Sequence, residues 1–128
     1  MDNSEAYINM CEKAKEIQFA HSIYELGAFY LHGRSIIDNL PEFSIATNIN
    51  AGKKRVLLDL KVWLPRQDQL QALIGNYNEQ CNAMYKYIVT EVILPSQVIN
   101  SMEQLWLKIV MKEKYNKAWV VDDWVIEK

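Results

Sequence analysis

The sequence has few of the residues that interrupt or cross-link a chain: its 128 residues include 4 glycines, 3 prolines and 2 cysteines. So little glycine and proline argues against a collagen-like or low-complexity chain, and two cysteines are too few for a disulfide-built scaffold. No apolar run reaches the roughly 20 residues that a membrane-spanning helix needs. The acidic, polar opening also lacks the basic start and apolar stretch of a signal peptide. These absences predict a soluble, intracellular protein that does not bind a membrane.

Half of the residues are hydrophobic and 23% are charged, which is typical of a globular chain. A chain of this size buries about two-thirds of its unfolded surface, enough for a core without cross-links. No linker, repeat or low-complexity segment interrupts it. We therefore predict a single domain over residues 1–128.

The apolar residues follow helical spacing at the start of the chain and alternate in the middle. Residues 4–18 have an amphipathic helical pattern, with Ser4 as the expected N-cap. Alternation in 43–50 and 54–64, with turn residues at 50–53, predicts a β-hairpin. Residues 22–32 favour a strand but also fit an extension of the first helix. Residues 34–41 would then be a connection.

Helical patterns return after residue 64. Pro65 suits the first turn of a helix, and Gly75-Asn76 predicts the end of that helix. A second helix is predicted over 81–92, and its apolar stripe consists of Cys81, Met84, Tyr85, Ile88, Val89 and Val92. A third begins at Ser101, which forms a capping-box pattern with Gln104, and its buried stripe consists of Met102, Leu105, Trp106, Ile109 and Val110. Residues 118–127 predict a short strand or hairpin. The expected fold is α+β, with an N-terminal helix, a small antiparallel sheet of about three strands, three further helices and a short C-terminal strand or hairpin.

Charge is divided unevenly along the chain. Residues 1–50 carry a net charge of −4 and residues 51–128 a net charge of +2. The predicted hairpin and the helix start after it contain a cluster of basic, polar and aromatic residues that forms our candidate macromolecule-binding surface. Its members are Lys53, Lys54, Arg55, Lys61, Trp63, Arg66, Gln67, Asp68 and Gln69.

The same residues have a purely structural interpretation. Charge on a sheet edge protects it from pairing with other sheets. Asp68 and the glutamines fit the amides of a first helical turn, while Arg66 would pair with an acidic group elsewhere. Basic residues beside an aromatic ring also suit nucleic acid, but an isoelectric point near 5.7 is low for a dedicated binder.

No pattern indicates a catalytic, metal or cofactor site. His21, His32, Cys11 and Cys81 are scattered without the local pairs that zinc sites use, and both cysteines fall on apolar helical stripes that predict buried thiols. The adjacent pair His21-Ser22 would not converge in a strand or a helix. Four isolated glycines offer no phosphate-binding loop. We expect no enzyme, no catalytic residue, no metal and no cofactor.

Three blocks carry a resemblance. Residues 10–18 (MCEKAKEIQ), 63–71 (WLPRQDQLQ), and 101–107 (SMEQLWL) with 110–117 (VMKEKYNK) before a tryptophan pair resemble small proteins that phages and prophages of Gram-positive bacteria encode. The segment between the tryptophans is Val-Val-Asp-Asp here, where the group has Asn-Gly. The resemblance implies a phage origin and the cytoplasm of a bacterial host cell, but no activity.

These observations predict a non-enzymatic interaction protein of phage type. It would bind a host or phage macromolecule, expected to be a protein, and interference with a host process such as defence is one use. The alternative is a nucleic-acid-binding accessory of phage replication or packaging. The sequence does not specify an oligomeric state.

Overall fold

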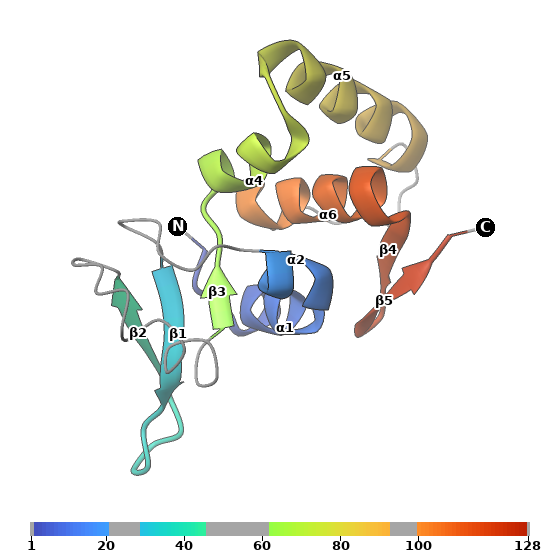
Figure 1. Cartoon of the computed structure of the whole chain (residues 1–128). Coiled ribbons are helices and arrows are strands. Elements are labelled where there is room, and N and C mark those ends of the chain that lie inside the picture. Colours follow the sequence, from blue (N-terminus) through green and yellow to red (C-terminus); the bar gives the residue numbers. More distant parts are fainter. Residues whose placement is uncertain (1, 21–28, 46–61, 93–99, 128) are drawn as a thin grey trace. The chain divides into compact units, whose positions relative to one another are not determined.

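The computed structural model describes residues 2–20, 29–45, 62–92 and 100–127. Helices and antiparallel strands are both present, so the α+β fold is confirmed (Figure 1). The chain groups into two compact units, which are Asn3–Pro65 and a second formed by Met1–Asp2 with Arg66–Lys128. We call them the sheet unit and the helical unit. The single domain over 1–128 stays a prediction.

The sheet unit begins with two short helices where the sequence predicts one. Helix α1 spans Glu5–Lys13 and α2 spans Lys15–Ala20, with a break at Ala14. The Ser4 Oγ accepts a hydrogen bond from the Tyr7 backbone N–H, which confirms the predicted N-cap. The predicted apolar stripe is buried throughout, at Tyr7, Met10, Cys11, Ala14 and Ile17.

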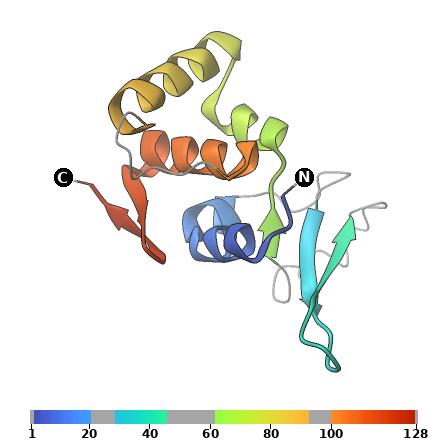
Figure 2. The same ribbon diagram turned by 180° about the vertical axis from the view of Figure 1, so that it is seen from behind.

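Three strands form the sheet of this unit, with β1 in the centre. Strand β1 (Phe29–Arg34) pairs antiparallel with β2 (Pro41–Ile45) on one side and with β3 (Val62–Leu64) on the other (Figure 2). The strand predicted in 22–32 is therefore confirmed for 29–32. The described ends of the two predicted hairpin strands lie on opposite sides of β1 and do not pair with each other. The predicted turn at 50–53 lies outside the described residues.

Buried polar contacts join α1 and α2 to β3 and to the residue after it. The Tyr7 hydroxyl donates to the Pro65 carbonyl over 2.6 Å. The Gln18 amide accepts from the Trp63 backbone N–H and donates to its carbonyl, each over 2.9 Å. The Gln18 amide therefore satisfies both backbone groups of Trp63, whose side chain is buried.

The helical unit contains α4 (Gln67–Ile74), α5 (Tyr77–Tyr87), the π-helical turn η2 (Ile88–Val92) and α6 (Met102–Tyr115). All three predicted helices are present, but α5 begins at Tyr77, four residues before the predicted start, and the predicted end, 88–92, is the π-helical turn. Pro65 lies just before the N-cap Arg66 and outside the first turn, a small correction. Gly75 ends α4 with a φ of 140°, which suits glycine.

Helix α6 is the core of this unit. Its buried residues are Gln104, Leu105, Trp106, Leu107, Ile109, Val110 and Met111, whereas the predicted stripe member Met102 is exposed. The Ser101 Oγ accepts from the Gln104 backbone N–H, as expected of the cap. The Gln104 side chain does not complete the predicted box; it donates to Asp2, which also accepts from the Ser101 hydroxyl over 2.5 Å.

A hairpin of β4 (Lys117–Val120) and β5 (Asp123–Ile126) follows α6, which confirms the hairpin version of the predicted C-terminal element. Asn116 ends the helix in the left-handed conformation. Trp119 and Trp124 are cross-strand partners with ring centroids 5.0 Å apart. Trp124 is buried and Trp119 is half-buried, as expected of indoles at the edge of a core.

Candidate functional site

The predicted binding surface is only partly described by the structure. Lys53, Lys54, Arg55 and Lys61 lie outside the described residues. Trp63 and Gln69 are 3% and 5% exposed, so neither belongs to a surface, and this part of the prediction is wrong. Aromatic and amide side chains suit binding sites, but here these two complete the packing of a strand and a helix start.

The remaining residues of that prediction follow its structural interpretation. The Gln69 Oε1 accepts from the Arg66 backbone N–H over 2.9 Å. The Arg66 guanidinium forms an ion pair with Asp68 over 3.0 Å, and this hydrogen-bonded cation lowers the pKa of the Asp68 carboxyl. Gln67, half-buried, opens α4 beside them. The described part of this cluster thus organises a helix start.

The two most exposed large apolar side chains of the described chain lie at the tip of the β1–β2 hairpin. Ile36 and Ile37 are each at least 96% exposed, and Leu40 is 60% exposed. Single exposed apolar residues are ordinary, but two adjacent isoleucines that leave almost no area in contact with their own chain, with a mostly exposed leucine nearby, are not. We call residues 35–40 the apolar tip. From the sequence, these residues are expected only to connect two strands.

Hydrogen bonds fix the backbone of the apolar tip. The Ser35 backbone N–H donates to the Leu40 carbonyl over 2.9 Å, and the Asn39 N–H donates to the Ser35 carbonyl over 3.0 Å. The Ser35 hydroxyl and the Asp38 carboxylate accept from the N–H groups of Ile37 and Leu40. Asn39 adopts the left-handed conformation that asparagine tolerates. The tip therefore presents its apolar side chains from an ordered turn.

An ion pair anchors the base of the hairpin. Both guanidinium nitrogens of Arg34 donate to the Glu5 carboxylate over 2.8 Å, and one also reaches the Asn39 carbonyl. The bidentate contact lowers the pKa of Glu5 and raises the pKa of Arg34. With Arg34 paired, Asp38 in the tip and Glu42 on β2 leave the described surroundings acidic.

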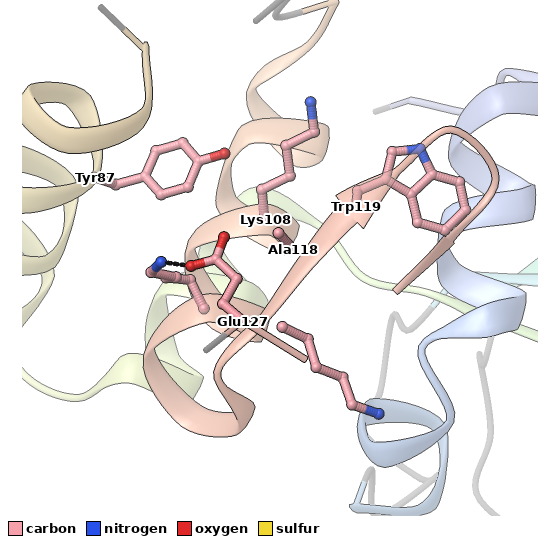
Figure 3. A pocket seen from close by; sticks show the side chains of 7 residues that line it. Tyr87, Lys108, Ala118, Trp119 and Glu127 are labelled. Atoms are coloured by element: carbon pink, nitrogen blue, oxygen red, sulfur yellow. Dashed lines mark ion pairs between the residues drawn. The ribbon is translucent and has the colours of Figure 1, made fainter. Parts of the chain in front are cut away.

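A small recess in the helical unit is lined mainly by basic and aromatic side chains. Its lining residues are Tyr87, Lys108, Lys112, Lys117, Ala118, Trp119 and Glu127 (Figure 3). Glu127 forms an ion pair with Lys112, and burial lowers the pKa of Lys108. Its volume of about 20 Å³ has room only for a water-sized molecule. The recess is a packing defect with polar walls and does not fit an organic ligand.

A wider hollow in the same unit has a volume of about 420 Å³, and residues of α4, α5 and α6 line it. Its ionic groups already have partners within the unit. Lys86 pairs with Glu113 over 3.4 Å, and the Lys114 ammonium donates to the Leu73 carbonyl over 3.0 Å. These contacts leave the hollow without a converging set of groups for a ligand.

Helix α5 differs from the sequence expectation. The predicted buried stripe includes Cys81, Tyr85, Ile88 and Val89, but all four are exposed, and Ala83 and Tyr87 are buried instead. Cys81 is therefore not the buried thiol that its position on the stripe suggests, whereas Cys11 is. The apolar face of α5 is a second surface that the described chain leaves uncovered.

The described ranges contain no group of three or more histidine, cysteine, aspartate or glutamate side chains placed to hold a metal ion. Nor does any helix within them have both the length and the apolar character needed to cross a membrane. The chain matches no protein-family model, no curated protein and no solved structure. The candidate site therefore depends on the apolar tip and the face of α5.

Proposed function

We propose that this chain is a non-enzymatic accessory protein of phage type, located in the cytoplasm of a bacterial host, that binds another protein through the apolar tip. The observation that carries this proposal is the exposure of Ile36 and Ile37, each at least 96%, on a turn held by its own hydrogen bonds. Because the turn is already ordered, little conformational entropy is lost when it enters a partner's cleft.

The charges around the apolar tip favour a protein over nucleic acid or an anionic membrane. Asp38 and Glu42 are acidic and the guanidinium of Arg34 is paired, so phosphate groups would be repelled here. An apolar cleft bordered by lysine or arginine would complement both the isoleucines and the carboxylates. Occupying such a cleft on a host protein would provide a way to interfere with a host process such as defence.

Affinity capture from a Gram-positive host lysate tests the proposal, with the tag at the C-terminus. The wild-type chain is expected to retain a defined protein, and the double variant Ile36→Asp, Ile37→Asp is expected to lose it. Val121→Asp is the matched control, because Val121 is 95% exposed at the turn of the other hairpin. The captured protein and this chain should then co-elute in gel filtration when both are purified.

Two results would overturn the proposal. One is a wild-type chain that retains no protein, and the other is a double variant that retains the same protein as the control. A mobility shift that weakens at higher salt and upon replacement of Lys53, Lys54 and Arg55 by alanine would instead support a nucleic-acid-binding accessory of replication or packaging.

A further inference from the structure

Helix α5 has apolar side chains on two opposite faces. Ala83 and Tyr87 are buried within the helical unit. On the other side, Tyr77, Cys81 and Tyr85 follow one another at intervals of four residues, which places them in one row along the helix. Tyr77 is 77% exposed and Tyr85 is 72% exposed. Together with the exposed Ile88 these residues form what we call the outer face of α5.

The outer face begins at a capping box, and a side-chain hydrogen bond links the end of the helix to η2. The Asn76 Oδ1 accepts from the Glu79 backbone N–H, and the Glu79 carboxylate accepts from the Asn76 N–H. At the other end, the chain continues into η2, where the Thr90 hydroxyl donates to the Lys86 carbonyl over 2.8 Å. The order of α5 therefore does not depend on a covering partner.

No charged side chain interrupts the outer face. Its neighbours around the helix are Asn78 and Asn82 on one side and Met84 on the other. The charged residues of α5, Glu79 and Lys86, lie on the opposite side and contact Asn76 and Glu113. Tyrosine and methionine without nearby charge are typical of the centre of a protein interface, and such a face offers nothing to phosphate groups.

The row is symmetric about Cys81, because a tyrosine lies four residues before it and another lies four residues after it. Consider two copies of α5 that pack antiparallel, with a two-fold axis passing between their Cys81 residues. Each Tyr77 then lies opposite the Tyr85 of the other copy. Each Ile88 then falls opposite position 74, before the other copy's α5 begins, so the row itself supplies the contact. Such a self-complementary surface is what an isologous dimer interface requires. Since no side chain of the row is charged, the two copies bring no like charges together.

We propose that the chain self-associates through the outer face of α5, forming an antiparallel two-fold dimer with Cys81 at the axis. The row and Ile88 span about 16 Å at the rise of an α-helix, so the contact is small and the association is weak. The proposal concerns the helical unit and does not depend on the apolar tip of the sheet unit. The interaction is non-covalent, and the thiols supply a probe of its geometry.

Helix geometry makes Cys81 a strict test of this arrangement. Helix axes pack about 8 to 10 Å apart, and the Cα atoms lie about 2.3 Å from each axis. Two residues that face each other on the two-fold axis therefore have Cα atoms close enough for a disulfide, which needs a separation of about 4.4 to 6.8 Å. A residue elsewhere on the unit meets its own copy only by random collision.

Sedimentation over a range from micromolar to sub-millimolar concentration measures the association. The wild-type chain is expected to shift from monomer to dimer as concentration rises. The variant Tyr77→Glu, Tyr85→Glu should stay monomeric, because it brings four carboxylates together. Met102→Glu, which changes an exposed apolar residue on α6, should dimerise like the wild type. A wild-type chain that is monomeric throughout, or a dimer that survives the double variant, would overturn the proposal.

Oxidation by diamide tests the position of the axis. Two thiolates transfer two electrons to one diamide, which takes up two protons, and a Cys81–Cys81 disulfide forms between the copies. The rate is expected to be at least tenfold higher than for a control that carries Cys81→Ser and Val125→Cys, because Val125 is exposed on β5 and does not belong to the outer face of α5. Equal rates in the two chains would exclude a contact centred on Cys81.

The capture assay for the apolar tip separates this proposal from the proposed function. If the Ile36, Ile37 variant loses its captured protein while the wild-type chain stays monomeric, the proposed function stands and self-association is wrong. If the Tyr77, Tyr85 variant loses a captured protein and the chain is monomeric, the outer face binds another protein and self-association is again wrong.

Discussion

Helices α5 and α6 lie in the same unit, and more than half of the residues of each are apolar, aromatic or cysteine, yet the two helices differ in what they bury. Helix α6 has seven buried residues, and α5 has two. Apart from the exposed Met102 and the half-buried Tyr115, the apolar side chains of α6 are buried in the core of the unit. Those of α5 exceed what the unit needs, and the surplus lies in one uncharged row. An apolar stripe thus identifies a face that packs, but it does not specify the surface against which it packs.

The two helices are expected to differ most in how much stability is lost when an apolar side chain is truncated. Leu107 of α6 is fully buried, so Leu107→Ala should lower the free energy of unfolding by about 2 to 5 kcal/mol. Tyr85→Ala on α5 removes a larger but mostly exposed side chain and should cost much less at dilute concentration. Urea unfolding monitored by tryptophan fluorescence measures both. Equal costs would mean that Tyr85 contributes to the core.

A smaller difference in stability is expected when the N-cap of each helix is removed. Ser101→Ala removes the cap of α6 and should cost about 1 to 2 kcal/mol, because its hydroxyl accepts from the Gln104 N–H and also donates to Asp2. Asn76→Ala removes the exposed cap of α5 and should cost about 0.5 to 1 kcal/mol. The denaturant midpoints of the two variants show which of them is less stable. A greater loss of unfolding free energy for Asn76→Ala than for Ser101→Ala would contradict this prediction.

A pH-dependent effect is expected from Lys108 of α6. Burial lowers the pKa of its ammonium, so in the window between the folded pKa and the unfolded value of about 10.4 the unfolded chain binds more protons. Stability contributed by this group therefore rises with pH across that window. Lys108→Met should raise the melting temperature at neutral pH, and its advantage should shrink as the pH approaches 10. A lower melting temperature for the variant at neutral pH would contradict this.

The smallest effect is expected on the outer face of α5. Tyr77→Glu, Tyr85→Glu should change the free energy of unfolding of the dilute monomer by no more than about 0.5 kcal/mol, because both side chains are mostly exposed. Glu at position 77 also lies in the first turn, where the helix dipole favours a negative charge. Circular dichroism during urea unfolding tests this. A loss above 1 kcal/mol would show that the row packs inside its own unit.

The sequence predicts most of the described elements because local signals define them. Ser4 and Ser101 are caps whose side chains accept from the expected amides, and Gly75 ends a helix at a positive φ. Strand pairing was harder to predict. The segments around β2 and β3 alternate correctly, but alternation is a property of each strand alone, and β1 lies between their described ends.

The candidate site was mostly not predictable. Trp63 and Gln69 were expected on a surface and are buried, because residue type alone does not distinguish a binding side chain from one that satisfies a backbone. Ile36 and Ile37 gave no periodic signal, since two apolar residues in a short connection match neither a helix nor a strand. Their significance depends on exposure, which only the folded arrangement of Ser35–Leu40 reveals.

The contact between Asp2 and the start of α6 has a consequence for the order in which the protein assembles during synthesis. Asp2 meets Ser101 and Gln104 across a sequence separation of about one hundred residues. On the ribosome, this contact forms only after α6 has emerged, so Asp2 must wait while residues 3–100 are made. Closure of such a long loop is slow. The sheet unit is one continuous segment, Asn3–Pro65, and can fold first.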